Sequence, residues 1–372
     1  GRGGHLYPLR GVADELIAET GGKIRLAYVG PRHSLEGEFH DRGIASFAIA
    51  GGKFRRYASL ENLLDIPRLV VSFVQAFTIL YRLMPDAVFS KGGTGALPVV
   101  VAAWFYLIPI VVHESDAIPG ISNKLSAKLA KRIAISFRSA AAFFPPEKTA
   151  FVGNPVRREL RGEGVAQSTA KQTLGFYQNV PLALVLGGSQ GSTRINTFVV
   201  DNLETLLTEV QIYHQTGDAN LEEVKASVRP VMQRASEELQ RRYRIVGSFA
   251  PDKLTLAFSA ADVILSRAGA GAIYEIAAFQ KPAILVPFPE AARNHQYRNA
   301  TEYAATGAAI IVEESNFKPH LVLTELKQLL SRVRTDPTIA AAARSFFKPD
   351  AAAIIAREVL KLAKRGSPEV SW

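Results

Sequence analysis

The sequence contains no cysteine among its 372 residues. This excludes disulfide bonds, thiolate chemistry and cysteine-ligated metal sites, and it fits a reducing compartment. A Gly-x-Gly-x-x-Gly motif after a strand, with an acidic residue about 20 positions later, is also absent, which argues against a Rossmann dehydrogenase. No Asp-x-Asp pair suited to a bridging metal occurs. We therefore expect a site that requires no metal and no cofactor.

Positive charge is concentrated in the first part of the chain. Up to Arg158 there are 20 Lys and Arg against 12 Asp and Glu, whereas the remainder has 24 against 22. A basic region of this kind attracts an anionic substrate or an anionic membrane surface. The interleaved aromatic residues typical of a nucleic-acid module do not accompany it, so we expect no nucleic-acid partner.

Two apolar stretches raise the question of membrane contact. Residues 92–112 are uncharged, but Pro98 and Pro109 interrupt them, so a turn, a helix and a short strand are expected rather than a membrane span. Residues 68–83 predict a helix that is apolar over most of its circumference. Its polar positions follow one narrow stripe, namely Arg68, Ser72, Gln75 and Arg82. Such a helix is either buried in the core or faces a membrane.

Strand-like runs alternate with helical patterns along the whole chain, which predicts an α/β fold with parallel sheets covered on both faces. The length suits two domains. We expect them at 1–158 and 159–346, with a linker at 158–173 and a helix at about 347–372 that packs back on the first domain. The expected strands are 24–30, 44–49, 87–90, 110–112, 133–136, 149–152, 183–186, 212–214, 244–246, 261–265, 283–286 and 308–311.

The chain opens on a glycine-rich turn, residues 1–5, that leads into a helix without a preceding strand. In a doubly wound fold a central strand normally feeds such a turn. We therefore expect the natural protein to begin further upstream.

The segment around Ser266–Glu275 carries the clearest ligand-binding pattern. A strand at 261–265 is followed by small residues and then by a helix at 273–280. Such a turn presents backbone N–H groups and a helix N-terminus to an anion. Glu275 is expected about one turn into the helix, where its carboxylate can accept hydrogen bonds from two ribose hydroxyls. A capped βα turn without a ligand is the alternative.

Similar turns follow other predicted strands, and together they carry a resemblance. The sequence resembles the MurG family of glycosyltransferases, which implies two Rossmann-like domains that face each other across a cleft (the GT-B fold). The motifs that carry the resemblance are Gly3-Gly4-His5, His113-Glu114 with Ile118-Pro119-Gly120, Gly153-Asn154-Pro155-Val156-Arg157, Gly187-Gly188-Ser189-Gln190-Gly191, Ser266-Arg267-Ala268-Gly269-Ala270 with Glu275, and His295-Gln296 with Asn299-Ala300.

The resemblance implies transfer of N-acetylglucosamine (GlcNAc) from UDP-GlcNAc to the 4-hydroxyl of N-acetylmuramic acid in lipid I, with inversion, to form lipid II. It further implies a peripheral location on the cytoplasmic face of the bacterial plasma membrane. The implied site residues are Glu275 for the ribose, the backbone of Ala250, Ala270, Gly271 and Ala272 for uracil and phosphate, Ser189, Gln190 and Arg157 for the diphosphate, Gln296 for GlcNAc, and Gly3, Gly4, His5 and Glu114 for the acceptor.

The chain departs from the family pattern at two places. Arg2 stands where the family usually has Thr, and adds a cation. Ser115-Asp116 stands where it usually has Gln-Asn. An ionised Asp only accepts hydrogen bonds, whereas an Asn also donates.

An inverting transfer needs a base for the incoming hydroxyl and compensation for charge on the leaving UDP. We prefer His5 as the base because its ordinary pKa lies near neutrality. Glu114 is the alternative base, or it orients His5 or the acceptor, and His5 could instead bind phosphate at a helix start. Arg157 and Arg267 could compensate the leaving charge, but Arg267 could equally form a salt bridge under its turn.

Two other functions are compatible with these motifs. One is another GT-B enzyme that uses a UDP-sugar, such as a glycolipid synthase or an epimerase. The other is a UDP-sugar-binding membrane scaffold with impaired catalysis, suggested by Arg2 and Asp116.

Overall fold

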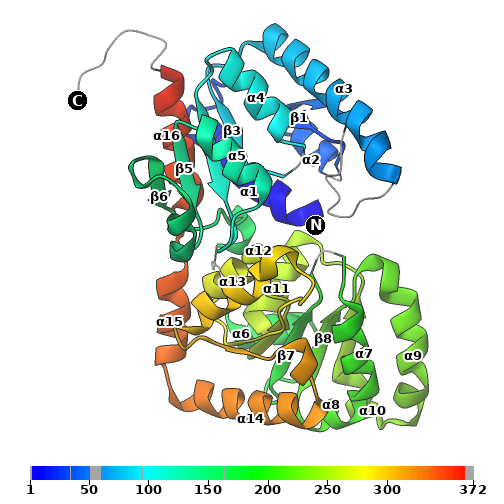
Figure 1. The fold of residues 1–372 in the computed structure, drawn as a ribbon. Coiled ribbons are helices and arrows are strands. Elements are labelled where there is room, and N and C mark those ends of the chain that lie inside the picture. Colours follow the sequence, from blue (N-terminus) through cyan, green and yellow to red (C-terminus); the bar gives the residue numbers. More distant parts are fainter. Residues whose placement is uncertain are drawn as a thin grey trace. The chain divides into compact units, whose positions relative to one another are not determined.

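The computed structural model describes residues 2–33, 35–50, 60–93, 95–161, 164–188 and 190–364, and for residues 2–5, 60–66, 292, 333 and 334 the backbone alone. The chain forms two compact units (Figure 1). The C-terminal unit is Val156–Pro349. The N-terminal unit is Arg2–Pro155 together with the segment that begins at Asp350.

The N-terminal unit alternates strands and helices and is completed by the last helix of the chain. Its elements are α1 (Arg2–Glu19), β1 (Ala27–Gly30), α2 (Glu36–His40), β2 (Ala45–Ala48), α3 (Leu60–Leu83), β3 (Val88–Ser90), α4 (Leu97–Phe105), β4 (Ile110–Glu114), α5 (Ile121–Leu129), β5 (Arg132–Ile135), β6 (Thr149–Phe151) and α16 (Ala351–Lys364).

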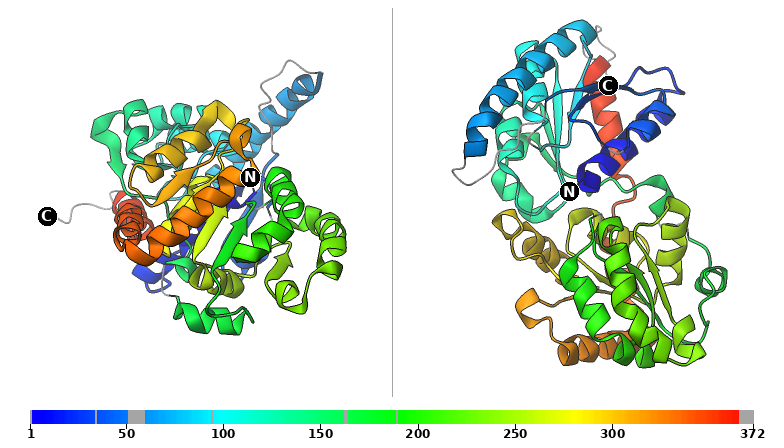
Figure 2. Two further views of the ribbon diagram at one scale, coloured as in Figure 1. Left: turned by 90° about the horizontal axis from the view of Figure 1, so that it is seen from below. Right: turned by 90° about the vertical axis from the view of Figure 1, so that its right-hand side faces the viewer.

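Four parallel strands form the main sheet of this unit, in the order β3-β4-β5-β6, while β1 and β2 pair separately. The alternation of β4 assigns its two faces. Ile110 and Val112 pack on one side with residues of α3, α4 and α5, whereas Val111 packs on the other with residues of α1 and α16. Figure 2 (right) shows α1 and α16 together on one side of this sheet. Arg132 ties α16 to β5 through Glu358 at 2.9 Å.

Two expectations for this unit need correction. Residues 2–5 form the first turn of α1 and not a glycine turn before it. The first strand begins at Ala27, three residues later than expected. The middle of the polar stripe of α3 faces the protein, because Ser72 is 1% exposed and Gln75 accepts a hydrogen bond from the backbone N–H of Ala50, whereas Arg68 and Arg82 at its ends are exposed.

The C-terminal unit contains a six-stranded parallel sheet. Its elements are α6 (Gln167–Thr173), β7 (Leu182–Leu186), α7 (Thr193–Asp201), α8 (Leu203–Glu209), β8 (Gln211–Gln215), α9 (Leu221–Arg234), α10 (Glu237–Arg241), β9 (Tyr243–Val246), α11 (Pro251–Ala260), β10 (Val263–Ser266), α12 (Ala270–Ala278), β11 (Ala283–Leu285), η5 (Ala292–Asn294), α13 (His295–Ala304), β12 (Ala309–Ile311), η6 (Glu314–Asn316), α14 (Pro319–Thr335) and α15 (Thr338–Phe346). Part of the expected linker is therefore helix, since α6 packs against α11.

The strand order of this sheet is β12-β11-β10-β7-β8-β9. The chain starts in the middle at β7, runs outward through β8 and β9, and returns to the middle at β10. Ligands of such doubly wound sheets bind where the order reverses, at the carboxyl ends of the central strands. Here that point lies between β7 and β10.

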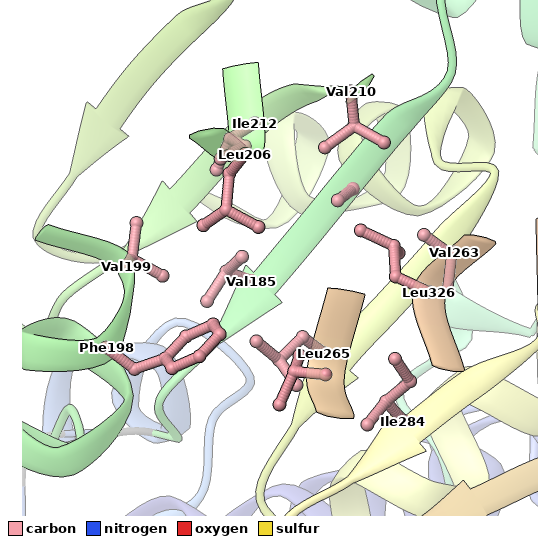
Figure 3. A pocket seen from close by; sticks show the side chains of 12 residues that line it. Val185, Phe198, Val199, Leu206, Val210, Ile212, Val263, Leu265, Ile284 and Leu326 are labelled. Atoms are coloured by element: carbon pink, nitrogen blue, oxygen red, sulfur yellow. The ribbon is translucent and has the colours of Figure 1, made fainter. Parts of the chain in front are cut away.

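The core of the C-terminal unit contains a small cavity of about 20 Å³. Figure 3 shows that its walls are aliphatic or aromatic, with Val185, Val199 and Leu265 among them. A space of this size is close to that of one water, and with no polar wall it is a packing defect and not a ligand site.

No helix in the described part of the chain is long and apolar enough to cross a membrane.

Candidate functional site

The loop after β7 lies at the point where the strand order reverses. Gly191 has φ +78°. A Cβ there would lie 1.9 Å from the carbonyl oxygen of Thr216, the residue that follows β8. A Cβ on Gly217 would lie 2.5 Å from the carbonyl oxygen of Gln190. The two loops thus touch through main chain, which only glycine permits. Gln190 is exposed above this contact, and Ser189 lies outside the described residues.

The N-terminus of α12 lies at the same point of the sheet, because β10 leads directly into it. Gly269 caps the helix in an extended conformation without a side-chain hydrogen bond. The first helical bond runs from Ile273 N to Gly269 O at 3.1 Å. The N–H groups of Ala270, Gly271 and Ala272 therefore precede the helical ladder, as in helix ends that bind phosphate.

Glu275 lies in the second turn of α12, as expected from the sequence. Its Oε1 accepts a hydrogen bond from Arg157 Nη2 at 3.0 Å. The Arg157 side chain is 7% exposed and that of Glu275 18%. The guanidinium therefore orients the carboxylate and balances its charge through one of its two oxygens.

Arg267 is held by its own unit. It forms an ion pair with Glu314, donates from Nε to Ser192 Oγ at 3.0 Å, and donates to the Val286 carbonyl oxygen at 3.3 Å. Ser192 is also the N-cap of α7, since its Oγ accepts from Ile195 N. The arginine thus joins the ends of β10 and β11 to α7, which is the salt-bridge role considered for it above.

Gln296 lies in the first turn of α13, where its Oε1 accepts a hydrogen bond from Phe288 N at 3.0 Å. The turn before it is unusual because Arg293 and Asn294 both have positive φ values, 58° and 56°. A pocket of about 560 Å³ borders this turn. It is lined by Arg194, Pro287, Pro289, Asn294, Tyr297, Glu313, Glu314 and Ser315.

A buried polar network lies next to the loops that follow β7 and β8. His214 bonds Asn196 on one ring nitrogen and Tyr243 on the other, each at 3.0 Å, and Asn196 Nδ2 donates to Thr216 O. Burial lowers the pKa of His214 to about 3, so the ring is neutral. The sequence pattern gave no sign of this network because its members come from three separate elements. Ala250, the remaining residue expected near the uracil, is exposed at the start of α11.

In the N-terminal unit, Glu114 ends β4 and is 4% exposed. Its Oε1 accepts from Asp116 N at 2.9 Å, and its Oε2 accepts from Asn123 Nδ2 at 2.9 Å and from Gly120 N at 3.3 Å. Glu114 therefore fixes the loop between β4 and α5. Burial, and next the charge of Asp116, raise the pKa of Glu114 above its ordinary value.

A second buried network joins the carboxyl ends of the four main strands. Lys91, after β3, donates from Nζ to Ser115 Oγ, which donates to Asn154 Oδ1 at 3.0 Å. His113 Nε2 lies 3.0 Å from Gly153 O and 3.1 Å from Ser136 Oγ. Burial and the nearby Lys91 lower the pKa of His113 well below its ordinary value. Lys91 was not among the expected site residues, because no local sequence pattern indicates its burial.

The expected acceptor-side residues Arg2, Gly3, Gly4 and His5 lie in the first turn of α1, and their side chains are outside the described part of the chain. Asp116 is half-buried in the loop that Glu114 holds. Within the described residues, no group of three His, Asp or Glu side chains is arranged to hold a metal ion.

Two family profiles match the chain. The Glycosyltransferase family 28 N-terminal domain matches residues 1–135, and the Glycosyltransferase family 28 C-terminal domain matches residues 182–355.

Three similar proteins are informative. The UDP-N-acetylglucosamine--N-acetylmuramyl-(pentapeptide) pyrophosphoryl-undecaprenol N-acetylglucosamine transferase of Shouchella clausii (strain KSM-K16) is 35% identical over 338 residues, which are 90% of each chain. The protein of the same name from Staphylococcus carnosus (strain TM300) is 38% identical over 291 residues, 77% of this chain and 76% of the relative. The crystal structure of Acinetobacter baumannii MurG is 25% identical, covers 97% of both chains and gives a TM-score of 0.71.

Proposed function

The chain belongs to the MurG family of glycosyltransferases, and from this we propose that it transfers GlcNAc from UDP-GlcNAc to lipid I to form lipid II. The GT-B fold and the glycosyltransferase class follow from the same family. The assignment of individual residues to the two substrates is our proposal and rests on the geometry of each unit.

The observation that carries the donor assignment is that the Gly191 loop and the α12 N-terminus follow the two neighbouring strands between which the strand order reverses. The Gly191 loop follows β7, and α12 follows the neighbouring β10. We assign the diphosphate to the α12 N-terminus and the ribose to Glu275, which Arg157 orients. Gln296 is assigned to the GlcNAc hydroxyls, with its amide oxygen already fixed by Phe288 N.

Charge that grows on the leaving UDP is best stabilised by groups that are already in place. The open N–H groups of α12 meet this condition. Arg157 adds a positive charge close to α12, because it forms an ion pair with Glu275 on that helix. Arg267 is assigned a structural role instead, because its guanidinium is occupied by Glu314, Ser192 and main-chain oxygens.

We assign the acceptor to the carboxyl edge of the sheet in the N-terminal unit. Glu114 has both oxygens engaged by its own loop, so we give it the orienting role and not that of the base. His5 is proposed as the base that accepts the proton of the incoming 4-hydroxyl, as its ordinary pKa permits.

The test is an acceptor panel with labelled UDP-GlcNAc, run with and without EDTA. We expect label in lipid II with lipid I as acceptor, no label with diacylglycerol, and the same rate in EDTA. Transfer to diacylglycerol alone, epimerised UDP-sugar, or donor binding without any turnover would refute the proposal. Loss of the rate in EDTA would refute the metal-free mechanism only.

We further propose that the enzyme binds peripherally to the cytoplasmic face of the plasma membrane through α3 and the end of α4. Because Ser72 and Gln75 face the protein, the opposite side of α3 is apolar and exposed. An apolar surface flanked by exposed basic residues, here Arg68 and Arg82, suits an anionic lipid surface. The exposed apolar residues are Val70, Val71, Val74, Tyr81, Leu83, Met84, Trp104, Phe105 and Leu107.

A sedimentation assay with vesicles that contain anionic lipid tests this surface. We expect a combined Val70→Ser, Val74→Ser and Phe105→Ser variant to remain folded and to lose most vesicle binding, because these residues are 57%, 62% and 61% exposed. Phe77 is unsuitable for the test since it packs on the core. Val165→Ser with Leu321→Ser, also exposed but in the C-terminal unit, is the matched control. Equal loss in both variants would contradict the assignment.

A further inference from the structure

Lys91 is a buried cation to which the reaction described above assigns no role. It follows β3 at the carboxyl edge of the sheet and is 3% exposed. Its Nζ donates to Ser115 Oγ, the residue next to Asp116. The neighbouring Gly92 has φ +81°, and a Cβ there would lie 2.0 Å from Asn123 Oδ1. The turn that carries Lys91 is therefore packed directly on the side chain that bonds Glu114.

Burial disfavours the charged form of this lysine. Burial lowers the pKa of Lys91 to about 8, even though Glu114 and Asp116 attract its charge. Below pH 8 the side chain is protonated in both the folded and the unfolded chain, and the full desolvation cost is present. Between about 8 and its ordinary value the unfolded chain binds more protons, so stability rises with pH. A neutral residue of similar size would therefore be the better structural choice.

The charges around Lys91 explain what the ammonium does. The titratable groups that face it within the described residues are His113 and Glu114 on β4 and Asp116 on the following loop. His113 is neutral, so two carboxylates share one cation. Burial, and next the charge of Asp116, raise the pKa of Glu114, and Lys91 opposes that rise. Both carboxylate oxygens of Glu114 accept hydrogen bonds that hold the loop. Asp116 is the more exposed of the two carboxylates.

We propose that Lys91 is a positioning residue for the acceptor, a claim that rests on the function proposed above. Its ammonium holds Ser115 and balances the two carboxylates, so that the loop between β4 and α5 keeps Asp116 in place. Asp116 then accepts a hydrogen bond from a hydroxyl of the acceptor sugar and fixes its orientation. An ionised carboxylate can only accept hydrogen bonds. At this place it therefore selects a sugar that presents a hydroxyl as donor.

The experiment compares Lys91→Met, Asp116→Asn and the double variant in the full chain. Wild-type transfer to lipid I is measured first, and its absence would refute the proposed function and not this inference. For Lys91→Met we expect an unchanged or higher Tm and unchanged Kd for UDP-GlcNAc. The kcat/KM for lipid I should fall by about tenfold to a hundredfold, the size of effect that a misplaced reactant produces.

The pH profile separates positioning from packing. Loss of the cation should move the acid limb of kcat/KM for lipid I in Lys91→Met to higher pH, because Lys91 lowers the pKa of Glu114 and the variant lacks that effect. In the double variant the loss should not exceed that of the worse single variant, since both residues act through one loop. An unmoved acid limb, additive losses, or a Lys91→Met variant with lower Tm and equal losses for both substrates would overturn the proposal.

Lys171→Met is the matched control. Lys171 is also buried, at 4% exposed, but it pairs with Asp262 in the C-terminal unit at 2.7 Å. We expect a lower Tm and an unmoved acid limb. A shift of the limb in this variant would show that the limb reports stability, which would also overturn the inference.

Discussion

Two glutamates at the sheet edges of the two units show how differently one residue type can be used. Glu275 lies on a helix, with its side chain 18% exposed, and pairs with Arg157. Glu114 ends a strand, is 4% exposed, and accepts three N–H groups of its own loop. The first is oriented by an ion-pair partner and keeps part of its side chain exposed. The second uses both carboxylate oxygens to hold the loop between β4 and α5, so its effect on the acceptor is indirect.

Removal of Glu114 is expected to have the largest effect. Glu114→Ala leaves Asp116 N, Gly120 N and Asn123 Nδ2 without their acceptor, so kcat/KM for lipid I should fall by about a hundredfold or more. Titration calorimetry should give an unchanged Kd for UDP-GlcNAc. Glu114→Gln, which retains one acceptor oxygen, should fall between. If the Kd for UDP-GlcNAc rose by the same factor by which kcat/KM for lipid I falls, the two glutamates would not differ in the substrate that they serve.

Removal of Glu275 should have the opposite selectivity. Glu275→Ala is expected to weaken UDP-GlcNAc binding by roughly 1–3 kcal/mol, the range for a lost charged hydrogen bond that leaves its partner buried. Glu275→Gln keeps the shape and serves as the control for charge. Donor affinity equal to that of the wild type would remove Glu275 from the ribose site.

The dependence of stability on pH provides a smaller effect that only Glu114 should show in this form. Its pKa is raised, so the folded protein binds a proton more strongly than the unfolded chain. Its contribution to the free energy of unfolding is therefore lost as pH rises from the unfolded pKa, about 4.3, through the folded value. The free energy of unfolding is measured with urea for Glu114→Gln and for the wild type. The value for the variant minus that for the wild type should be larger at pH 7 than at pH 4.5. An identical difference at both values would mean that the pKa is not raised.

The smallest effect concerns the core and neither glutamate. Val199 lines the cavity of about 20 Å³ in the C-terminal unit. Val199→Ile adds one methylene there and should raise the free energy of unfolding by up to about 0.8 kcal/mol. Donor and acceptor kinetics should not change. A lower Tm would show that the cavity cannot take the extra group without strain.

Most of the fold could be predicted from the sequence because the central strands of both main sheets are buried and read as short apolar runs. Every expected strand is present, with ends that differ by a few residues. The family, predicted from motifs in fixed order, is confirmed by relatives of 35% and 38% identity. The linker was only partly right, since Gln167–Thr173 is short and polar yet forms a helix that α11 covers.

The site was less predictable because its geometry depends on contacts between distant segments. Arg157 and Glu275 are 118 residues apart, and Arg267 and Glu314 are 47 apart. A motif identifies such residues but not their partners. Lys91 was missed for the same reason, because only the fold brings it against Ser115. The direction of the α3 polar stripe was likewise set by a distant partner, the backbone of Ala50.

The central claim, transfer from a nucleotide sugar to lipid I, is tested most directly by the anomeric configuration of the product. The purified chain is given UDP-GlcNAc and lipid I, and the new linkage is examined by proton NMR. We predict a β-linked GlcNAc on the muramyl 4-hydroxyl, the inverted configuration. An α-linked product, free GlcNAc, or lipid I recovered unchanged would contradict the account.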